Sequence, residues 1–381
     1  MKKIKVLQVN KLYYPKIGGI EKVVQDIAEG LNKDVDMRVL VCQEKGKPTY
    51  DNINGIKVLR AGSLGTLWSL PISFTFILYF KKIAKKADVL QIHMPFPLAD
   101  LAYLFSGYDG KIVLWWHSDV VRQQKAMFLY KPVMNYLLSK ADTIIVATQG
   151  HIDSSLYLSK YKNKCKIIPY GIDLDKFYID VSKDKLLNSN NNNLKKILFI
   201  GRLVYYKGLE VLIDAMSHVQ EAELFIIGEG VLKQKLLKQI SSLGLTQKIH
   251  LLGELKDEQV KSCLRDCDIF VLPSIANSEA FGIVQIEAMA FGKPIINTSL
   301  PTGVPYVSID NETGLTVLPN NVEELSKAIQ KLINNDELRK KLGENALNRV
   351  KEHFDKKLML KNIYEIYRTE KYDEKKVGNN K

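Results

Sequence analysis

Short apolar runs alternate with longer segments of helical period along the first half of the chain. The apolar runs have the length and the Val, Ile and Leu content of buried strands; they are Ile4–Val9, Met37–Val41, Val89–His93, Lys111–Trp116 and Thr143–Ala147. Helical patterns separate them, such as those at Glu21–Leu31 and Tyr130–Lys140. Because strands that alternate with helices form a parallel sheet covered on both faces, this half is predicted to be a doubly wound, Rossmann-like α/β domain.

The second half repeats this alternation. Its apolar runs are Lys196–Ile200, Glu223–Ile227, Ile249–Leu252, Ile269–Leu272 and Pro294–Asn297, and helical patterns occur at Leu209–Val219, Val231–Leu243, Asp257–Asp266 and Val284–Phe291. The polar run Asn188–Asn193, which cannot build a core, lies between the two series. We therefore expect two domains, residues 1–175 and 194–354, with a hinge between Gly171 and Leu194. A helix over 355–372 is expected to pack back towards the first domain, followed by a frayed tail at 373–381.

Composition and charge narrow the class of protein. The chain has 381 residues, 46% hydrophobic and 25% charged, which excludes a disordered or fibrous protein. The net charge is +13, and residues 1–186 carry most of it, with 28 Lys and Arg against 17 Asp and Glu. A basic surface attracts phosphates, whether of nucleic acid, anionic lipid or a phosphorylated substrate. A general richness in lysine would explain the total but not the asymmetry between the halves.

The segment Leu64–Phe80 is seventeen residues long and contains no charge. Pro71 interrupts it and leaves a short helix before a lysine cluster, which falls short of the roughly 20 residues that a spanning helix needs. The segment fits a core helix of the first domain or an amphipathic helix on a bilayer. Its aromatic residues cluster in one helix, which favours contact with an anionic membrane surface over nucleic acid. RNA-binding modules carry their stacking aromatics on strands. The aromatics are Trp68, Phe74, Phe76, Tyr79 and Phe80, and the lysines are Lys81, Lys82, Lys85 and Lys86.

The cysteines and the start of the chain bear on the compartment. Cys42, Cys165, Cys263 and Cys267 are poorly spaced for a zinc site and are expected to be reduced thiols, as in the cytosol. Met1-Lys2-Lys3 leads directly into a strand pattern rather than a long apolar leader. A cytoplasmic protein, peripherally associated with the inner face of the plasma membrane, is the expectation.

Candidate ligand-binding residues follow the strands, because ligands of open parallel sheets bind at the carboxyl ends of strands. Gly18-Gly19 stands before the first helix, where backbone N–H groups can approach an anion. The same pair also fits a plain tight turn. In the second half, Arg202 and Lys207 flank the start of a helix and are placed to converge on one phosphate group, Arg as a bidentate fork and Lys as a point charge. Two unrelated surface cations are the alternative.

Two glutamates lie eight positions apart in the second half. Glu279 falls in a loop, where its carboxylate can accept hydrogen bonds from sugar hydroxyls, and Glu287 falls in the following helix, where it can hold a ribose diol. The N–H groups of Phe281, Gly282 and Ile283 lie between them, at the positive end of that helix. Surface glutamates favoured by the helix dipole are the alternative.

Taken in order and at this spacing, the motifs resemble those of the retaining glycosyltransferases of family 4, over nearly the whole chain. The motifs are Gly18-Gly19-Ile20-Glu21, His117, Gly171-Ile172-Asp173, Gly201-Arg202 with Lys207-Gly208, Gly228-Glu229-Gly230, and Glu279 with Glu287. The resemblance implies the GT-B fold, two facing Rossmann-like doubly wound domains with parallel sheets. It also implies that Arg202 and Lys207 bind the donor diphosphate, that Glu287 contacts the ribose, and that Glu279 and the backbone after it contact the transferred sugar.

His117 and His93 each follow a strand of the first half. A single histidine at such a place is usually structural, and His93 is expected to be so. The family resemblance gives His117 a place near the donor sugar and acceptor, so His117 and Glu279 are the candidate catalytic residues.

The segments 115–119 and 300–305 are similar to those of bacterial surface-polysaccharide mannosyl- and rhamnosyltransferases. The implied reaction moves a hexose, mannose favoured, from a nucleotide-diphosphate sugar to a glycan acceptor on a polyprenyl diphosphate. Arg202, Lys207 and helix N-termini can stabilise the departing charge, and no Asp-x-Asp follows a strand, so neither a metal nor another cofactor is expected. A UDP-sugar epimerase of the same fold and a non-catalytic membrane-surface protein are the alternatives.

Overall fold

The computed structural model describes residues 3–16, 18–67, 70–119, 124–179, 181–183, 185–188 and 193–368. Trp68, the tail at 373–381 and most of the Asn188–Asn193 run lie outside these residues. The chain forms two compact units. The first unit consists of Met1–Pro169 with Met359–Lys381, and the second unit of Tyr170–Leu358.

The first unit is built on a sheet of eight strands in the order β10-β9-β8-β7-β1-β2-β4-β3. All neighbours are parallel except β3, which runs antiparallel to β4 at the edge. The strands are β1 Lys5–Val9, β2 Asp36–Cys42, β3 Thr49–Ile53, β4 Ile56–Ala61, β7 Val89–Met94, β8 Lys111–Trp116, β9 Thr143–Val146 and β10 Cys165–Ile167, with a separate pair β5 Thr66–Leu67 and β6 Leu70–Pro71. The helices are α1 Gly19–Leu31, α2 Phe74–Ala84, α3 Pro97–Leu104, α4 Gln124–Lys140, α5 Gln149–Ser154, a 3-10 helix at Leu158–Lys164, and α14 Lys356–Arg368.

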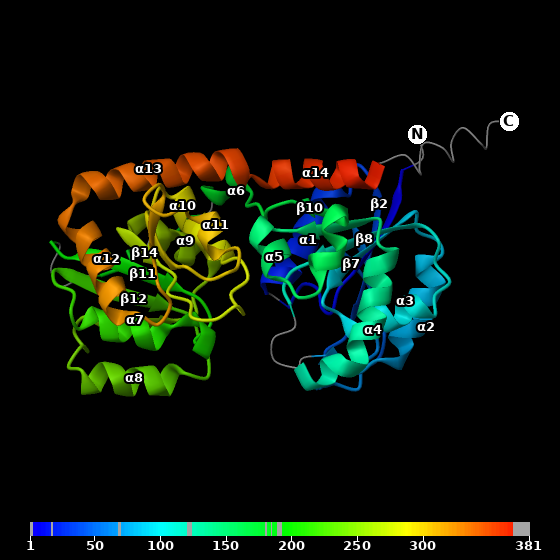
Figure 1. The fold of residues 1–381 in the computed structure, drawn as a ribbon, viewed down its shortest axis with the longest axis horizontal. Coiled ribbons are helices and arrows are strands. Elements are labelled where there is room, and N and C mark those ends of the chain that lie inside the picture. The colour runs from blue at the N-terminus through cyan, green and yellow to red at the C-terminus, as the bar shows by residue number, and fades with distance from the viewer. Residues whose placement is uncertain are drawn as a thin grey trace. The chain divides into compact units, whose positions relative to one another are not determined.

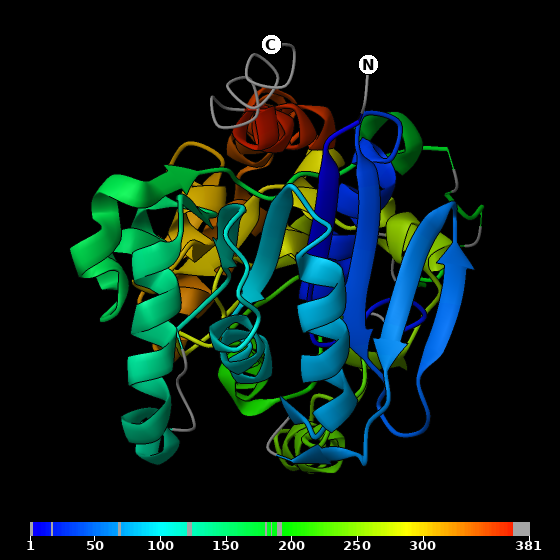
Figure 2. The same cartoon turned by 90° about the vertical axis from the view of Figure 1, so that its right-hand side faces the viewer.

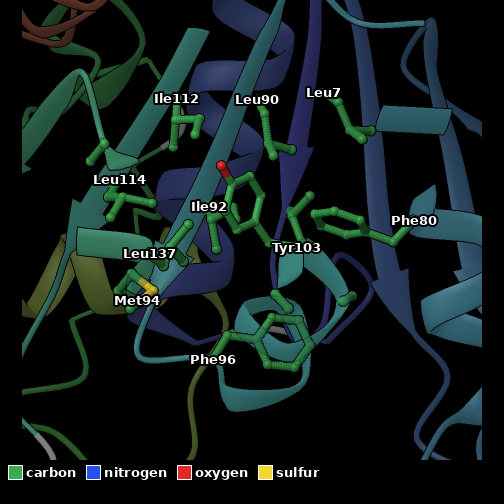
Figure 3. Packing of buried hydrophobic residues seen from close by; sticks show 14 of the residues in the cluster. Leu7, Phe80, Leu90, Ile92, Met94, Phe96, Tyr103, Ile112, Leu114 and Leu137 are labelled. Carbon is green, nitrogen blue, oxygen red and sulfur yellow. The ribbon is translucent and has the colours of Figure 1, made fainter. Parts of the chain in front are cut away.

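Helices α2, α3 and α4 cover one face of this sheet, and α1 and α14 lie on the other (Figure 1). Figure 2 shows the strands side by side, dark blue for β1 and β2 and lighter blue towards the edge, with α2 in front of them. On the α2 side, alternate strand residues such as Leu90, Ile92 and Met94 point towards Tyr103 and Leu137 (Figure 3). This alternation follows from the two-residue period of a strand and gives the unit an apolar core.

Helix α2 resolves the two interpretations of the charge-free segment. Phe76 and Phe80 are fully buried in the core, so they hold α2 on the sheet, each by about 1.5–3 kcal/mol. These two aromatics therefore do not face a bilayer. Phe74 and Leu78, in contrast, are 75% and 69% exposed and lie one turn apart. The segment is thus a core helix whose outer face is apolar.

The second unit has six parallel strands in the order β13-β12-β11-β14-β15-β16, the order of a doubly wound sheet. Figure 1 shows α7, α8 and α12 on one side of this sheet and α9, α10 and α13 on the other. The strands are β11 Lys195–Ile200, β12 Ala222–Ile227, β13 Ile249–Gly253, β14 Ile269–Val271, β15 Ile295–Thr298 and β16 Gly314–Val317. The helices are α6 Leu174–Phe177, a 3-10 turn at Tyr205–Lys207, α7 Leu209–Met216, α8 Lys233–Ser242, α9 Asp257–Asp266, α10 Ile283–Ala290, α11 Val304–Val307, α12 Val322–Asn334 and α13 Asp336–His353.

The chain passes between the units twice, at Pro169–Tyr170 and at Leu358–Met359. The first passage comes before the hinge expected from the sequence, because the residues after it are paired within the second unit. Ile172 N–H donates to the carbonyl of Phe354 at 2.9 Å, and Lys356 forms an ion pair with Asp173 at 2.9 Å. The returning segment then enters α14, whose residues from Met359 onwards belong to the first unit.

Candidate active site

In the second unit, the strand order reverses between β11 and β14. Ligands of such sheets bind in the crevice outside the carboxyl ends of these two strands. The loops that follow the two strands bring Lys207 and Glu279 together, with Lys207 Nζ 2.6 Å from Glu279 Oε2. The two side chains are only 11% and 10% exposed. A nearly buried ion pair therefore lies where the fold places a ligand.

A serine completes the surroundings of the Glu279 carboxylate. The hydroxyl of Ser274, fully buried, donates to Glu279 Oε2 at 3.0 Å. The carbonyl of Ser274 in turn accepts from the hydroxyl of Thr298 at 2.6 Å. Glu279 is thus held by both a cation and a hydroxyl. Ser274 is not among the residues predicted from the sequence, because its only signal there is its place shortly after a strand.

Two glycines allow the loops to approach so closely. At Gly208, φ is +69°, and a Cβ would lie 1.9 Å from the carbonyl oxygen of Pro273 in the loop after β14. At Gly228, φ is +133°, and a Cβ would lie 2.0 Å from the carbonyl oxygen of Gly201. Side chains at these positions would force the backbones apart. These glycines of the predicted motifs therefore shape the crevice.

Arg202 and Lys207 lie on the same loop but in different surroundings. Arg202 is exposed and donates to the hydroxyl of Tyr206 at 3.1 Å, whereas Lys207 is buried against Glu279. The Tyr205 hydroxyl lies 3.3 Å from Ser278 Oγ, which links this loop to the loop after β14. The Arg202 guanidinium thus faces solvent, where an anionic ligand can reach it.

The remaining predicted residues of the second unit lie at the start of α10. Gly282 is its N-cap with φ +74°, and Ile283 is its first residue. The ring of Phe281 is buried and packs edge-on against Tyr170, with 4.8 Å between centroids. Glu287 is half-buried in the second turn of the helix. The backbone of residues 281–283 therefore begins the helix, as the sequence predicted.

In the first unit, Gly18 and Gly19 begin α1. Gly18 is the N-cap in an extended conformation, and Gly19 is the first, exposed residue of the helix. The preceding loop is fixed by Arg60 on β4, whose guanidinium donates to the carbonyls of Tyr13 and Tyr14. A buried arginine thus holds the loop that leads to the two glycines.

His117 follows β8 and is 3% exposed. Its Nε2 lies 2.9 Å from Nδ1 of His93, and both rings stack with Trp115 at centroid distances of 5.7 and 5.9 Å. His93 was expected to be structural, but it contacts the candidate catalytic histidine directly. The signal for this contact is the parallel pairing of β7 and β8, in which Met94 lies opposite Trp116.

The two histidines are in an environment that disfavours a positive charge. Burial lowers the pKa of His93 to about 3. Burial, with His93 as a further cause, lowers the pKa of His117 well below its ordinary value. Both rings are therefore neutral at physiological pH. In the part of the chain that the structure describes, His, Cys, Asp and Glu side chains form no group of three suited to a metal ion.

Two doubly wound α/β units, one with a nearly buried ion pair at its topological switch point, define a two-domain protein of the Rossmann-like class. Comparison with protein families agrees with this class. Residues 17–176 match the model described as glycosyltransferase family 4, and residues 182–349 match that of the glycosyl transferases group 1.

Relatives of known name match nearly the whole chain. The D-rhamnosyltransferase WbpZ of Pseudomonas aeruginosa is 32% identical, over 92% of this chain and 92% of the relative. The O-antigen chain mannosyltransferase C of Escherichia coli is 31% identical, over 96% of this chain and 98% of the relative. The chain therefore belongs to glycosyltransferase family 4, and it is a hexosyltransferase.

Solved structures support the fold. Sucrose-phosphate synthase from Thermosynechococcus elongatus superimposes with a TM-score of 0.81 at 21% identity, covering 96% of this chain and 98% of the other. HepE of Anabaena, in complex with UDP-glucose, superimposes with a TM-score of 0.77 at 20% identity, covering 95% of this chain and 99% of the other. The GT-B fold predicted from the sequence is confirmed.

Proposed function

We propose that this glycosyltransferase moves a hexose, with mannose favoured, from a nucleotide-diphosphate sugar to a lipid-linked glycan during surface-polysaccharide synthesis, with retention of anomeric configuration. The observation that carries the proposal is the Lys207–Glu279 pair at the switch point of the second unit. The names of the relatives, a D-rhamnosyltransferase and an O-antigen mannosyltransferase, support the sugar class and the acceptor class.

The donor diphosphate is assigned to Arg202 and Lys207. Transfer breaks the bond between the anomeric carbon and the diphosphate oxygen, so negative charge grows on the departing group. Cations that are already in place stabilise this charge without reorganisation. Arg202 is exposed and Lys207 is buried against Glu279 on the same loop, so one cation is open to solvent and the other is held in place by the protein. The complex of HepE with UDP-glucose supports a nucleotide sugar as the donor.

The donor site is tested by Arg202→Ala. Loss of one charge-assisted hydrogen bond, about 1.5–3 kcal/mol, should weaken donor binding by roughly 10- to 150-fold. Lys340→Ala, which removes an exposed cation from α13, is the matched control and should leave binding unchanged. Isothermal titration with GDP-, UDP- and dTDP-sugars measures both variants and identifies the base. Equal affinity of Arg202→Ala and wild type for the bound donor would refute the assignment.

The two glutamates are assigned different roles. Glu279 contacts the transferred sugar, whose charge changes in the transition state, so Glu279→Gln should mainly lower kcat. Glu287 contacts the ribose throughout, so Glu287→Gln should mainly raise the donor KM. Steady-state kinetics on both variants would contradict the assignment if the effects were exchanged.

The first unit is proposed to dock on an anionic membrane. On α2, Phe74 and Leu78 are exposed one turn apart, and exposed Lys81 and Lys82 lie in the last turn. Exposed Lys85 and Lys86 follow the helix. The neighbouring helix α3 adds the exposed side chains of Leu101, Leu104 and, at its end, Phe105. Such a mixed apolar and basic surface suits the boundary between acyl chains and head groups. Among the helices in the described part of the chain, none is long and apolar enough to cross a membrane.

Sedimentation with liposomes tests the docking. Each lysine near anionic lipid contributes about 1 kcal/mol, so four contribute a useful reversible attraction. Changing Lys81, Lys82, Lys85 and Lys86 to Glu should abolish binding to phosphatidylglycerol vesicles and leave donor binding intact. Changing three exposed lysines of α13 (Lys340, Lys341 and Lys351) to Glu is the control. If the wild-type protein does not sediment with these vesicles at physiological salt, the docking proposal is wrong and a soluble acceptor is the better interpretation.

A further inference from the structure

A line of buried polar side chains crosses the first unit from α14 to His117. The Tyr367 hydroxyl donates to Gln91 Oε1, and Gln91 Nε2 lies 3.4 Å from His93 Nε2. His93 Nδ1 then lies 2.9 Å from His117 Nε2. Each of the four side chains is at most 3% exposed. Gln91 and His93 share one side of β7 because alternate strand residues point the same way.

The atoms that face one another set the direction of these hydrogen bonds. The Gln91 oxygen faces Tyr367, so the phenol donates to it, and the Gln91 NH₂ group faces His93. An amide nitrogen cannot accept, so His93 Nε2 must be the acceptor and carry no proton. A neutral His93 therefore carries its proton on Nδ1 and donates it to His117 Nε2. The proton of neutral His117 is then on Nδ1.

We propose that Tyr367, Gln91 and His93 are positioning residues that hold His117 in the Nδ1–H tautomer. In this tautomer Nδ1 of His117 is a hydrogen-bond donor and Nε2 accepts from His93, so the ring does not act as a base. A part for His117 in sugar transfer rests on the proposed function, whereas the tautomer rests on the contacts of the four side chains. Stacking of both imidazoles with Trp115 keeps the two rings within 12° of its plane, so the hydrogen bond between them stays aligned.

The tautomer is measured directly by long-range ¹H–¹⁵N spectra of protein labelled with ¹⁵N at histidine. The signals of His117 are assigned as those that disappear in the His117→Gln variant. The wild type should show His117 neutral, with the proton on Nδ1. His93→Phe keeps an aromatic ring beside Trp115 but removes the donor, so His117 should move to the Nε2–H tautomer. Tyr367→Phe frees the Gln91 amide to turn and should give a mixture of tautomers. His218→Gln, which removes an exposed histidine of the second unit, should leave the His117 signals unchanged.

Kinetics give a second readout. Loss of one neutral hydrogen bond should lower kcat of His93→Phe by about 3- to 10-fold, with the donor KM nearly unchanged. A wild-type His117 that carries its proton on Nε2, or that keeps one tautomer in both variants, would overturn the proposal. If His93→Phe does not fold, the tautomer of His117 in Tyr367→Phe, which keeps the aromatic ring, tests the proposal. If the tautomer shifts as expected but the protein transfers no sugar, the proposed function is refuted. The positioning role of Tyr367, Gln91 and His93 is then still supported.

Discussion

Lys207 lies in the second unit with its charge almost out of water, so its removal should have a measurable cost in stability. Its Nζ is 2.6 Å from Glu279 Oε2, and neither side chain is more than 11% exposed. Lys207→Met keeps the volume of the side chain but leaves the carboxylate without its cation. Breaking a buried ion pair on one side costs about 3–5 kcal/mol. The Ser274 hydroxyl, which still donates to Glu279, places the expected loss near the lower end, about 3 kcal/mol.

Calorimetry and urea unfolding measure this loss. For a unit of this size, about 3 kcal/mol corresponds to a fall in Tm of roughly 6–12 °C. The double variant Lys207→Met with Glu279→Gln removes both charges and should regain most of the stability, because no buried charge is then unpaired. Arg202→Ala is the matched control, since this exposed cation should affect donor binding but not Tm. A Tm of Lys207→Met within about 1 °C of that of Arg202→Ala would show that the pair is not effectively buried.

Three further predictions address the crevice, a buried carboxyl and the metal requirement. Gly208→Ala should lower both Tm and donor affinity because its Cβ would meet the carbonyl of Pro273; Gly244→Ala, with a similar φ of +68° and open space, is the control for strain alone. Burial raises the pKa of Asp100 to about 7, so Asp100 stabilises the fold fully below its unfolded pKa of 3.8, and this stability is lost as the pH rises through 7. The free energy of unfolding of Asp100→Asn should therefore rise relative to that of the wild type, by up to roughly 4 kcal/mol, as urea titrations move from pH 4 to pH 8. A difference between the two proteins that does not change with pH would contradict this prediction. Activity should persist in EDTA, and complete loss restored by Mg²⁺ or Mn²⁺ would contradict a metal-independent reaction.

The sequence predicted the buried parallel strands well because their apolar runs are unambiguous. Strand β8 has the predicted bounds Lys111–Trp116, and α9 has the predicted bounds Asp257–Asp266. The hairpin of β3 and β4 was not predicted, although Asn54-Gly55 between its strands is a typical hairpin turn, with φ of +51° and +84°. Strand β3 is mostly exposed and polar, so it lacks the apolar signal on which the prediction relied.

The candidate site could be predicted as a set of residues but not as a set of contacts. The motif residues Lys207 and Glu279 are 72 positions apart, and only the strand order shows that their loops meet. His93 was undervalued for the same reason, because its contact with His117 depends on the register between β7 and β8. Spacing along the chain carries no information on register between strands.

Helix α14 has a consequence for protein synthesis. The first unit needs residues from the far end of the chain, since the buried side chains of Met359, Ile363 and Tyr367 belong to it. Domains usually fold in the order in which they leave the ribosome. Here the second unit is complete in the nascent chain while the first still lacks its last helix. The part translated first is thus the part finished last, and a premature stop codon after Leu358 would spare the second unit and damage the first.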